Sequence, residues 1–207
     1  YNAFMTKINF IYFDIGGVLI QDFSDTNKWH EMYADLGMTP DQIIEIDKLY
    51  SKFKRKFMTV LEIDAFTPLL KKDLGITLPA DYSMLADFVA RFTPNKSIWP
   101  ALKSIQSQYR TGLLTNMYPN MLDAIKAADL MPPAKWDVTV DSSVEGVQKP
   151  DSVIYQIATK WAGVPHEEIL FIDNTEKNVK RAESVGWQTF HYDSSDYKQA
   201  SADLFSF

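Results

Sequence analysis

The chain has no cysteine among its 207 residues. This absence excludes a disulfide scaffold, a thiolate nucleophile and a zinc–thiolate site. The sequence also lacks any apolar run near the roughly 18 residues that a membrane-spanning helix needs, and it lacks a basic N-terminal region followed by a signal-peptide core. We therefore expect a cytoplasmic protein with no membrane partner, whose native start is Met5.

An excess of basic residues is missing as well. The chain has 21 lysines and arginines against 27 acidic residues, and its net charge is -6. A chain of this charge with no basic cluster is not expected to bind nucleic acid. Hydrophobic residues make up 46% of the sequence and aromatic residues 14%, which is enough for a sizeable core. The length suits one α/β domain with a smaller accessory domain.

Short apolar runs alternate with helical patterns along most of the chain. Such alternation predicts a parallel sheet covered by helices on both faces. The expected strands are residues 8–13, 109–115, 136–140, 169–172 and 188–192. The expected helices between them are residues 98–107, 121–128, 152–161 and 178–185.

One region interrupts this alternation directly after the first strand. Residues 20–93 contain no convincing strand and show helical periodicity at 26–36, 40–57, 62–74 and 81–91. We predict a core domain made of residues 5–19 and 94–207, and a helical cap domain made of residues 20–93. A cap inserted at this point lies over the edge of the sheet where ligands bind. The docking of the tail from Ser194 onwards is not predicted.

The first strand ends at Asp14, which is followed by Ile15, Gly16 and Gly17. A strand of this kind delivers one carboxylate to its tip, and the glycines let a ligand approach closely. At neutral pH an ordinary aspartate is ionised and can act as a nucleophile or a metal ligand. A helix cap or a carboxylate bonded to backbone amides is an equally good interpretation of Asp14 alone.

Two further signals follow other predicted strands. Thr115 and Asn116 offer a hydroxyl and backbone amides that can hold phosphate oxygens, although both residue types are also common in turns. Lys149 precedes Pro150 at the start of a helix, after a polar loop over residues 141–148. A lysine in this position can pair with a phosphate as a point charge, or can be an ordinary solvated lysine.

Asp173 and Asn174 end the fourth strand and precede another helix. Oxygen ligands at a strand tip suit a hard cation, and either residue can instead cap the helix. Each signal is weak when taken singly. Their order along the chain, each at the end of a predicted strand, is much more specific.

In this order of motifs the chain resembles the haloacid dehalogenase superfamily, most of whose members are phosphatases that form an aspartyl-phosphate. The resemblance covers nearly the whole chain: its four motifs are carried by Asp14, by Thr115, by Lys149, and by Asp173-Asn174 with Asn178. It implies a Rossmann-like α/β core of a parallel sheet flanked by helices, with a small α-helical cap.

The resemblance also implies roles for these residues. Asp14 is the expected nucleophile, and Lys149 neutralises charge on the phosphoryl group. Thr115, Asn116 and Lys149 are the expected substrate-binding residues. The expected Mg²⁺ ligands are Asp14, the Gly16 carbonyl, Asp173 and Asn174, and the expected substrate is a small, sugar-phosphate-like metabolite.

Two positions depart from the pattern of the family. Gly16 stands where the phosphatases carry a second aspartate that acts as general acid and base, and Asn174 stands where a metal-binding aspartate is common. Loss of a general acid/base lowers rates about 10²–10⁴-fold. We therefore weigh a Mg²⁺-dependent phosphatase against a weak or inactive binding protein and against a metal-independent, dehalogenase-like hydrolase. The oligomeric state is not specified by the sequence.

Overall fold

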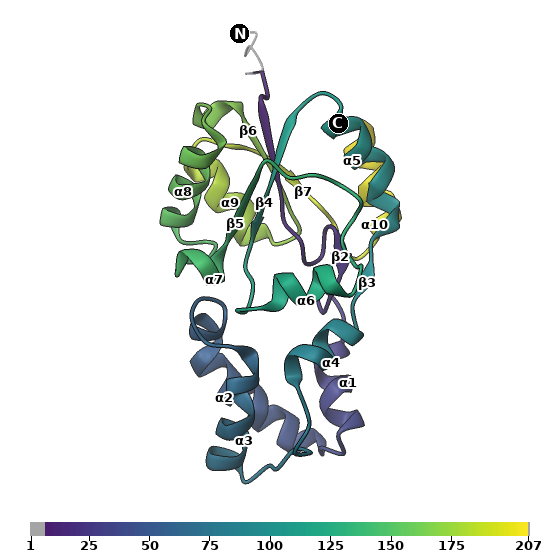
Figure 1. The fold of residues 1–207 in the computed structure, drawn as a ribbon, viewed down its shortest axis with the longest axis vertical. Helices are drawn as coiled ribbons and strands as arrows, with labels where there is room; N and C mark the ends of the chain where they lie inside the picture. Colours follow the sequence, from purple (N-terminus) through teal and green to yellow (C-terminus); the bar gives the residue numbers. More distant parts are fainter. Residues whose placement is uncertain (1–6, 207) are drawn as a thin grey trace.

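The computed structural model describes residues 7–206. Residues 1–6 and 207, including the expected start at Met5, lie outside the described residues. The main feature is a five-stranded sheet with the order β5-β4-β1-β6-β7, in which every pair is parallel (Figure 1). Its strands are β1 (Phe10–Phe13), β4 (Arg110–Thr115), β5 (Val138–Asp141), β6 (Ile169–Asp173) and β7 (Gln188–His191). The predicted α/β fold and each of its five expected strands are therefore confirmed.

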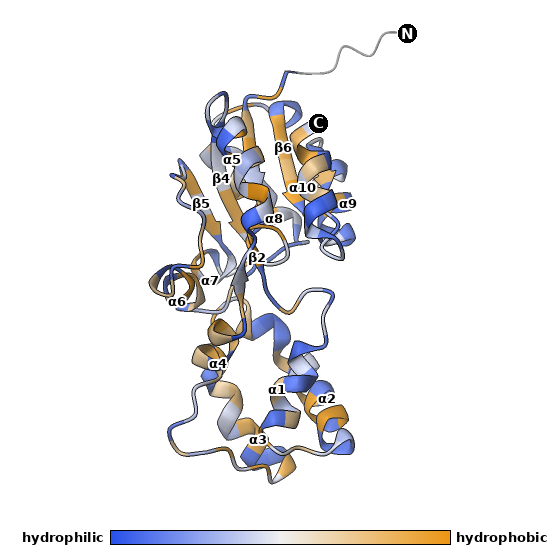
Figure 2. Ribbon diagram, turned by 90° about the vertical axis from the view of Figure 1, so that its right-hand side faces the viewer, coloured by the Kyte–Doolittle hydropathy of each residue, from blue (hydrophilic) through white to orange (hydrophobic). Residues whose placement is uncertain are grey.

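The two faces of the sheet are buried by different helices. Ile11 and Phe13 of β1 point to one core cluster, which includes residues of α5 (Trp99–Gln106) and α10 (Tyr197–Ser206). Phe10 and Tyr12 point to the other, with residues of α8 (Ser152–Ala162) and α9 (Glu176–Ser184). This alternation is the period of two that a strand imposes on its side chains. Figure 2 shows the resulting apolar centre of the sheet layer.

The helical insertion lies beyond one edge of the sheet (Figure 1). It contains α1 (Lys28–Asp35), α2 (Pro40–Phe57), the 3-10 turn η1 (Ile63–Ala65), α3 (Phe66–Leu74) and α4 (Met84–Ala90). A capping box at Thr39 and Gln42 fixes the start of α2 at Pro40, the start expected from the sequence. The insertion packs around buried aromatic side chains, among them Tyr33, Phe57 and Phe66.

Two connecting strands differ from the sequence-based expectation. The insertion is entered by β2 (Ile20–Gln21) and left by β3 (Thr93–Pro94), and these form a two-stranded antiparallel sheet. The prediction of no strand between the first strand and residue 93 was wrong at Ile20–Gln21, because two residues carry no readable periodicity. Asn95, fully buried, donates from Nδ2 to the Val18 carbonyl at 2.6 Å and ties the two connections together.

Several short elements connect the strands and helices of the core. These are α6 (Met121–Ala127) and the 3-10 turns η2 (Lys96–Ile98) and η3 (His166–Glu168). The polar loop expected after the third strand begins with the short helix α7 (Ser142–Glu145), whose N-cap Asp141 accepts a bond from the Ser143 amide. The tail forms α10, which packs against α5 through buried Ala200 and Leu204. No helix within residues 7–206 is long and apolar enough to cross a membrane.

Candidate active site

The polar residues singled out in the sequence meet at one edge of the sheet. Because all five strands are parallel, their carboxyl ends lie together. Asp14 follows β1, Thr115 ends β4 and Asp173 ends β6. This is the edge that faces the helical insertion, as Figure 1 shows.

Lys149 is the centre of the polar cluster. Its side chain is fully buried, and its Nζ atom lies 2.9 Å from Asp14 Oδ2 and 2.7 Å from Asp173 Oδ2. Nζ also donates to the Leu114 carbonyl at 2.8 Å, so the ammonium has three oxygen partners. A buried ammonium is stable only when it is paired and hydrogen-bonded in this way. The solvated-lysine interpretation therefore does not apply to Lys149.

The charges of this cluster perturb one another. Burial raises the pKa of Asp14 from 3.8 to about 7, although the Lys149 ammonium opposes the shift. Burial also disfavours the charged form of Lys149, but Asp14 and Asp173 outweigh it and raise the pKa of Lys149 above its ordinary value. When both carboxylates are ionised, the single cation between them leaves a net negative charge, which favours binding of a further cation.

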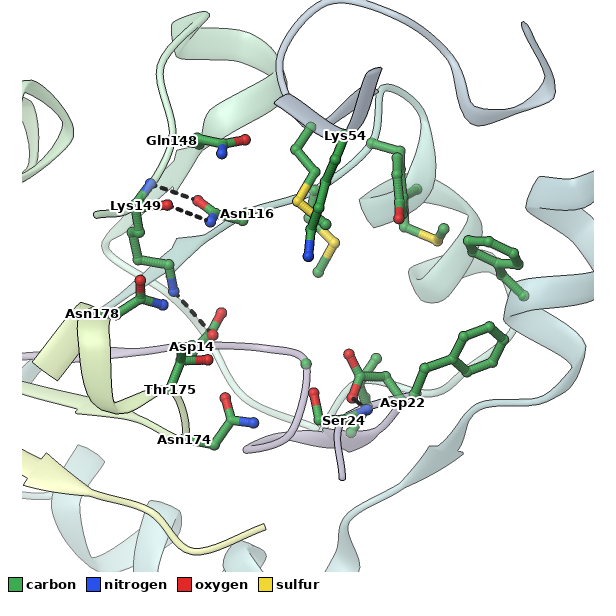
Figure 3. Close-up of a pocket in the computed structure, with 18 of the residues that line it drawn as sticks. Asp14, Asp22, Ser24, Lys54, Asn116, Gln148, Lys149, Asn174, Thr175 and Asn178 are labelled. Carbon is green, nitrogen blue, oxygen red and sulfur yellow. Dashed lines mark hydrogen bonds and ion pairs between the residues drawn. The ribbon is translucent and has the colours of Figure 1, made fainter. Parts of the chain in front are cut away.

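Thr115 and Asn116 lie beside Lys149 and have different surroundings. The Asn116 side chain accepts from the Lys149 amide at 2.8 Å and donates to the Lys149 carbonyl at 2.9 Å, so it fixes the backbone of the lysine (Figure 3). The Thr115 hydroxyl is buried and has no hydrogen-bond partner among the described residues. Such a group requires an explanation, although Thr115 is not among the residues that line the cavity described below.

Asp173 and Asn174 point in different directions. Asp173 is completely buried and accepts from the Thr175 amide at 2.7 Å and from Asn178 Nδ2 at 3.1 Å, in addition to Lys149. Asn174 instead lines the cavity and donates from Nδ2 to Ser194 at 3.1 Å. Of these two neighbours, Asn174 is the one placed to contact a ligand, and Asp173 is placed to hold Lys149.

A cavity of about 510 Å³ lies between the sheet edge and the helical insertion. Asp14, Asn116 and Lys149 form part of its polar floor (Figure 3). The opposite wall is mostly apolar and comes largely from the insertion and its connections: Phe23, Trp29, Tyr50, Met58, Phe88 and Phe92. A pocket of this size, with few polar groups among apolar ones, is typical of a small-molecule site.

The donor set suits a hard cation. Asp14, the Gly16 carbonyl and the Asn174 side-chain oxygen all belong to residues that line the cavity, and Mg²⁺ prefers oxygen ligands with one or two carboxylates. Asn174 approaches the loop after β1 closely, since a Cβ atom on Gly17 would lie 2.2 Å from Asn174 Nδ2. No group of three or more histidine, cysteine or acidic side chains arranged for a metal occurs within residues 7–206.

Another cavity residue, Asp22, was missed by the sequence analysis. Asp22 follows β2, and its side chain lies next to Gly16: a Cβ atom built on Gly16 would lie 2.3 Å from Asp22 Oδ2. Burial raises the pKa of Asp22, and the bond from the Ser24 amide opposes the shift. The sequence gives no signal for this approach, because it depends on the two-residue strand β2.

A comparison with protein-family models shows the family of the chain. The model of the haloacid dehalogenase-like hydrolases matches residues 8–186 of the chain. The match includes every site residue discussed above except those of the tail. The protein belongs to this family of hydrolases, and the predicted resemblance is confirmed.

Solved structures share the fold across nearly the whole chain. A haloacid dehalogenase family enzyme of Bacteroides thetaiotaomicron, in complex with magnesium and inorganic phosphate, has 22% identity and a TM-score of 0.71, over 91% of this chain and 96% of that one. A predicted haloacid dehalogenase-like family hydrolase of Porphyromonas gingivalis has 24% identity and a TM-score of 0.75, over 97% of this chain and 98% of that one. The L-2-haloacid dehalogenase of Xanthobacter autotrophicus has 21% identity and a TM-score of 0.61, over 89% and 77%.

A curated relative matches only in part. Mouse acyl-CoA dehydrogenase family member 10 is 31% identical over 98 residues, which is 46% of this chain and 9% of that protein. The chain therefore spans less than a tenth of the length of this relative.

Proposed function

We propose that the protein is a Mg²⁺-dependent phosphatase of a small phosphorylated metabolite, and that it acts through an aspartyl-phosphate on Asp14. The observation that carries this proposal is the contact of Asp14 Oδ2 with the Lys149 ammonium at 2.9 Å on the floor of the cavity. A lysine beside a carboxylate lowers the repulsion that an incoming phosphate dianion meets. The division into a core and a helical cap, with the cap selecting the substrate, is part of the same proposal.

The other site residues take complementary roles. The unpartnered hydroxyl of Thr115 donates to a phosphoryl oxygen, and Asn116 keeps Lys149 in place through its two backbone bonds. Asp173 holds the lysine from the side away from the cavity. The Ile15 amide donates to Asp14 Oδ1 at 2.7 Å, which leaves Oδ2 beside Lys149 as the attacking atom.

The ligands that we propose for Mg²⁺ are Asp14, the Gly16 carbonyl and Asn174. Among the predicted ligands, Asp173 is assigned the second role of holding Lys149, since both of its oxygens already accept hydrogen bonds. When bound, Mg²⁺ neutralises part of the charge on the carboxylate and the phosphoryl group, so that these anions can approach each other. An asparagine supplies an oxygen without a charge, so we expect weaker binding than at a site with two acidic ligands.

Phosphate release tests the proposal. The panel contains sugar phosphates, nucleotides and acyl phosphates, assayed with Mg²⁺, with a chelator, and with Asp14→Asn as the matched control. Turnover that requires both Mg²⁺ and Asp14 supports the phosphatase. Binding of phosphate without turnover across the panel supports the binding protein instead.

The metal-independent hydrolase is the second candidate, since L-2-haloacid dehalogenases share the fold with TM-scores of 0.61 and 0.64. Release of chloride from 2-chloropropionate that is insensitive to a chelator and lost in Asp14→Asn supports this candidate and contradicts the phosphatase.

A further inference from the structure

The space beside Gly16 is occupied by a carboxyl group from another part of the chain. A Cβ atom built on Gly16 would lie 2.3 Å from Asp22 Oδ2 and 3.0 Å from Asp22 Cγ. The backbone of Gly16 does not have a positive φ angle, unlike that of Gly17, so a side chain at position 16 is excluded by Asp22 and not by backbone strain. Asp22 therefore places a carboxyl group where a longer side chain at position 16 would point.

Backbone contacts between residues 16 and 20 form a turn that brings the following segment back beside Gly16. The Gly17 amide donates to the Ile20 carbonyl at 2.9 Å, and Gly16 forms an isolated bridge with Ile20. The pairing of β2 with β3 then fixes the direction of the chain up to Gln21. Asp22 is thus held by backbone bonds on the residues just before it.

The two oxygens of Asp22 differ in their contacts. Oδ1 accepts from the Ser24 amide at 2.9 Å, which orients the carboxyl group. Oδ2 is the atom nearest to Gly16, and the half-buried carboxyl group also interacts with the Ser24 side chain. Asp14 and Asp22 both line the cavity, and Figure 3 shows them at the border of the same open space. The Asp22 carboxyl group therefore borders the space that a substrate would occupy.

We propose that Asp22 is the general acid and base of this enzyme and replaces, from a different position in the chain, the carboxyl group that Gly16 lacks. This inference rests on the proposed phosphatase function. It names a further catalytic residue, because Asp22 Oδ2 would contact the leaving oxygen of the substrate directly.

The reaction then balances in two steps. In the first, Asp14 Oδ2 forms a bond to phosphorus, the bond from phosphorus to the leaving oxygen breaks, and that oxygen takes its electron pair and a proton from the Asp22 carboxyl. In the second, Asp22 takes a proton from a water molecule, the water oxygen bonds to phosphorus, and the bond to Asp14 breaks. The products are the alcohol and inorganic phosphate, and Asp22 is protonated again.

The variant Asp22→Asn tests the assignment, because it keeps the shape and the oxygen that accepts from Ser24. Two probes are compared in the presence of Mg²⁺: p-nitrophenyl phosphate, whose leaving group needs no proton, and an alkyl phosphate such as glycerol phosphate. General acid/base catalysis contributes about 10²–10⁴-fold. We expect a loss of this size with the alkyl probe.

Rapid-mixing kinetics separate the two steps. With p-nitrophenyl phosphate, we expect Asp22→Asn to release up to one equivalent of nitrophenolate in a fast burst, followed by slow turnover as phosphate stays on Asp14. A structural role for Asp22 would lower the burst and the later phase together and would contradict the proposal. Asp41→Asn, which changes an exposed carboxylate outside the cavity, is the control and should keep the rates of the unmodified protein.

A transfer of the carboxyl group gives an independent test. Asp22→Gly should lose activity, and Gly16→Asp in the same chain should restore at least a tenth of the alkyl phosphatase rate, since removal of Asp22 frees the space. No recovery in a folded double variant would overturn the proposal, as would unchanged rates in Asp22→Asn. Absence of turnover in the unmodified protein would instead refute the proposed phosphatase.

Discussion

Two carboxylates contact the same lysine, and we predict that neutralising them has opposite effects on stability. Asp14 and Asp173 lie 2.9 and 2.7 Å from Lys149 Nζ. Both can be changed to asparagine with almost no change in shape. We predict that Asp14→Asn stabilises the protein in the absence of Mg²⁺, whereas Asp173→Asn destabilises it.

The magnitude for Asp14 comes from its pKa, which burial raises from 3.8 to about 7. The folded protein therefore keeps the proton between these pH values while the unfolded chain releases it. The stability that is lost by ionising buried Asp14 is zero below pH 4. It grows as the pH rises and reaches its full size above pH 7. At about 1.4 kcal/mol per pKa unit, removal of the charge stabilises the fold by at most about 4 kcal/mol at pH 8 and about 2 kcal/mol at pH 5.

Neutralising Asp173 is expected to lower the stability of the fold. Its carboxylate is completely buried and accepts from Lys149, the Thr175 amide and Asn178. An asparagine at this position turns an amide donor towards other donors. Breaking a buried pair by removing one partner costs about 3–5 kcal/mol, so we expect Asp173→Asn to lose about 3 kcal/mol.

Urea unfolding in a chelating buffer at pH 5 and pH 8 measures both effects. Saturating Mg²⁺ should then reduce the difference in the free energy of unfolding between Asp14→Asn and the unmodified protein. The reason is that a ligand at 100 times its Kd stabilises the unmodified protein by about 2.7 kcal/mol. Destabilisation by Asp14→Asn at pH 8, or an effect of the same size at both pH values, would refute the description of Asp14 as a buried, destabilising charge.

Three further predictions concern single contacts. Lys149→Met leaves two buried carboxylates without their cation, so we expect a loss of about 3–5 kcal/mol in urea unfolding and no measurable phosphatase activity. Gly17→Ala places a Cβ atom 2.2 Å from Asn174 at a φ of 75°, so we expect a weaker apparent Mg²⁺ affinity in titrations of activity; unchanged affinity would argue against Asn174 as a ligand. Tyr118→Phe removes the hydrogen bond that Tyr118 makes with Tyr50 of the insertion, so we expect a stability loss of about 0.5–1.5 kcal/mol; a loss below 0.3 kcal/mol would show that the bond contributes little.

The sequence predicted the strands of the sheet well, because most of them contain a short apolar run and alternate with helical patterns. Asp14 and Asp173 follow such runs directly, and Lys149 is marked by the proline after it. The helix α2 was predicted at its observed bounds, since Thr39 followed by Pro40 is a recognisable helix start. These signals are local, so they need no knowledge of the fold.

Features that depend on contacts between distant segments could not be predicted from the sequence. The strand β2 is too short for a periodic pattern, and the short helix α7 lies within a polar stretch. The tail could not be placed because its helix is only weakly amphipathic, and its position depends on contacts with α5. Each of these elements is decided by the surface that it contacts.

The order of Asp14, Thr115, Lys149 and Asp173 along the sequence was sufficient to indicate the family and to suggest the residues of the candidate site. Only the tertiary structure decided that Asp173 holds the lysine while Asn174 faces the cavity, since neighbouring residues at the end of a strand point in opposite directions. Only the tertiary structure brought Asp22 to Gly16, because this contact depends on how the chain folds back between β1 and β2.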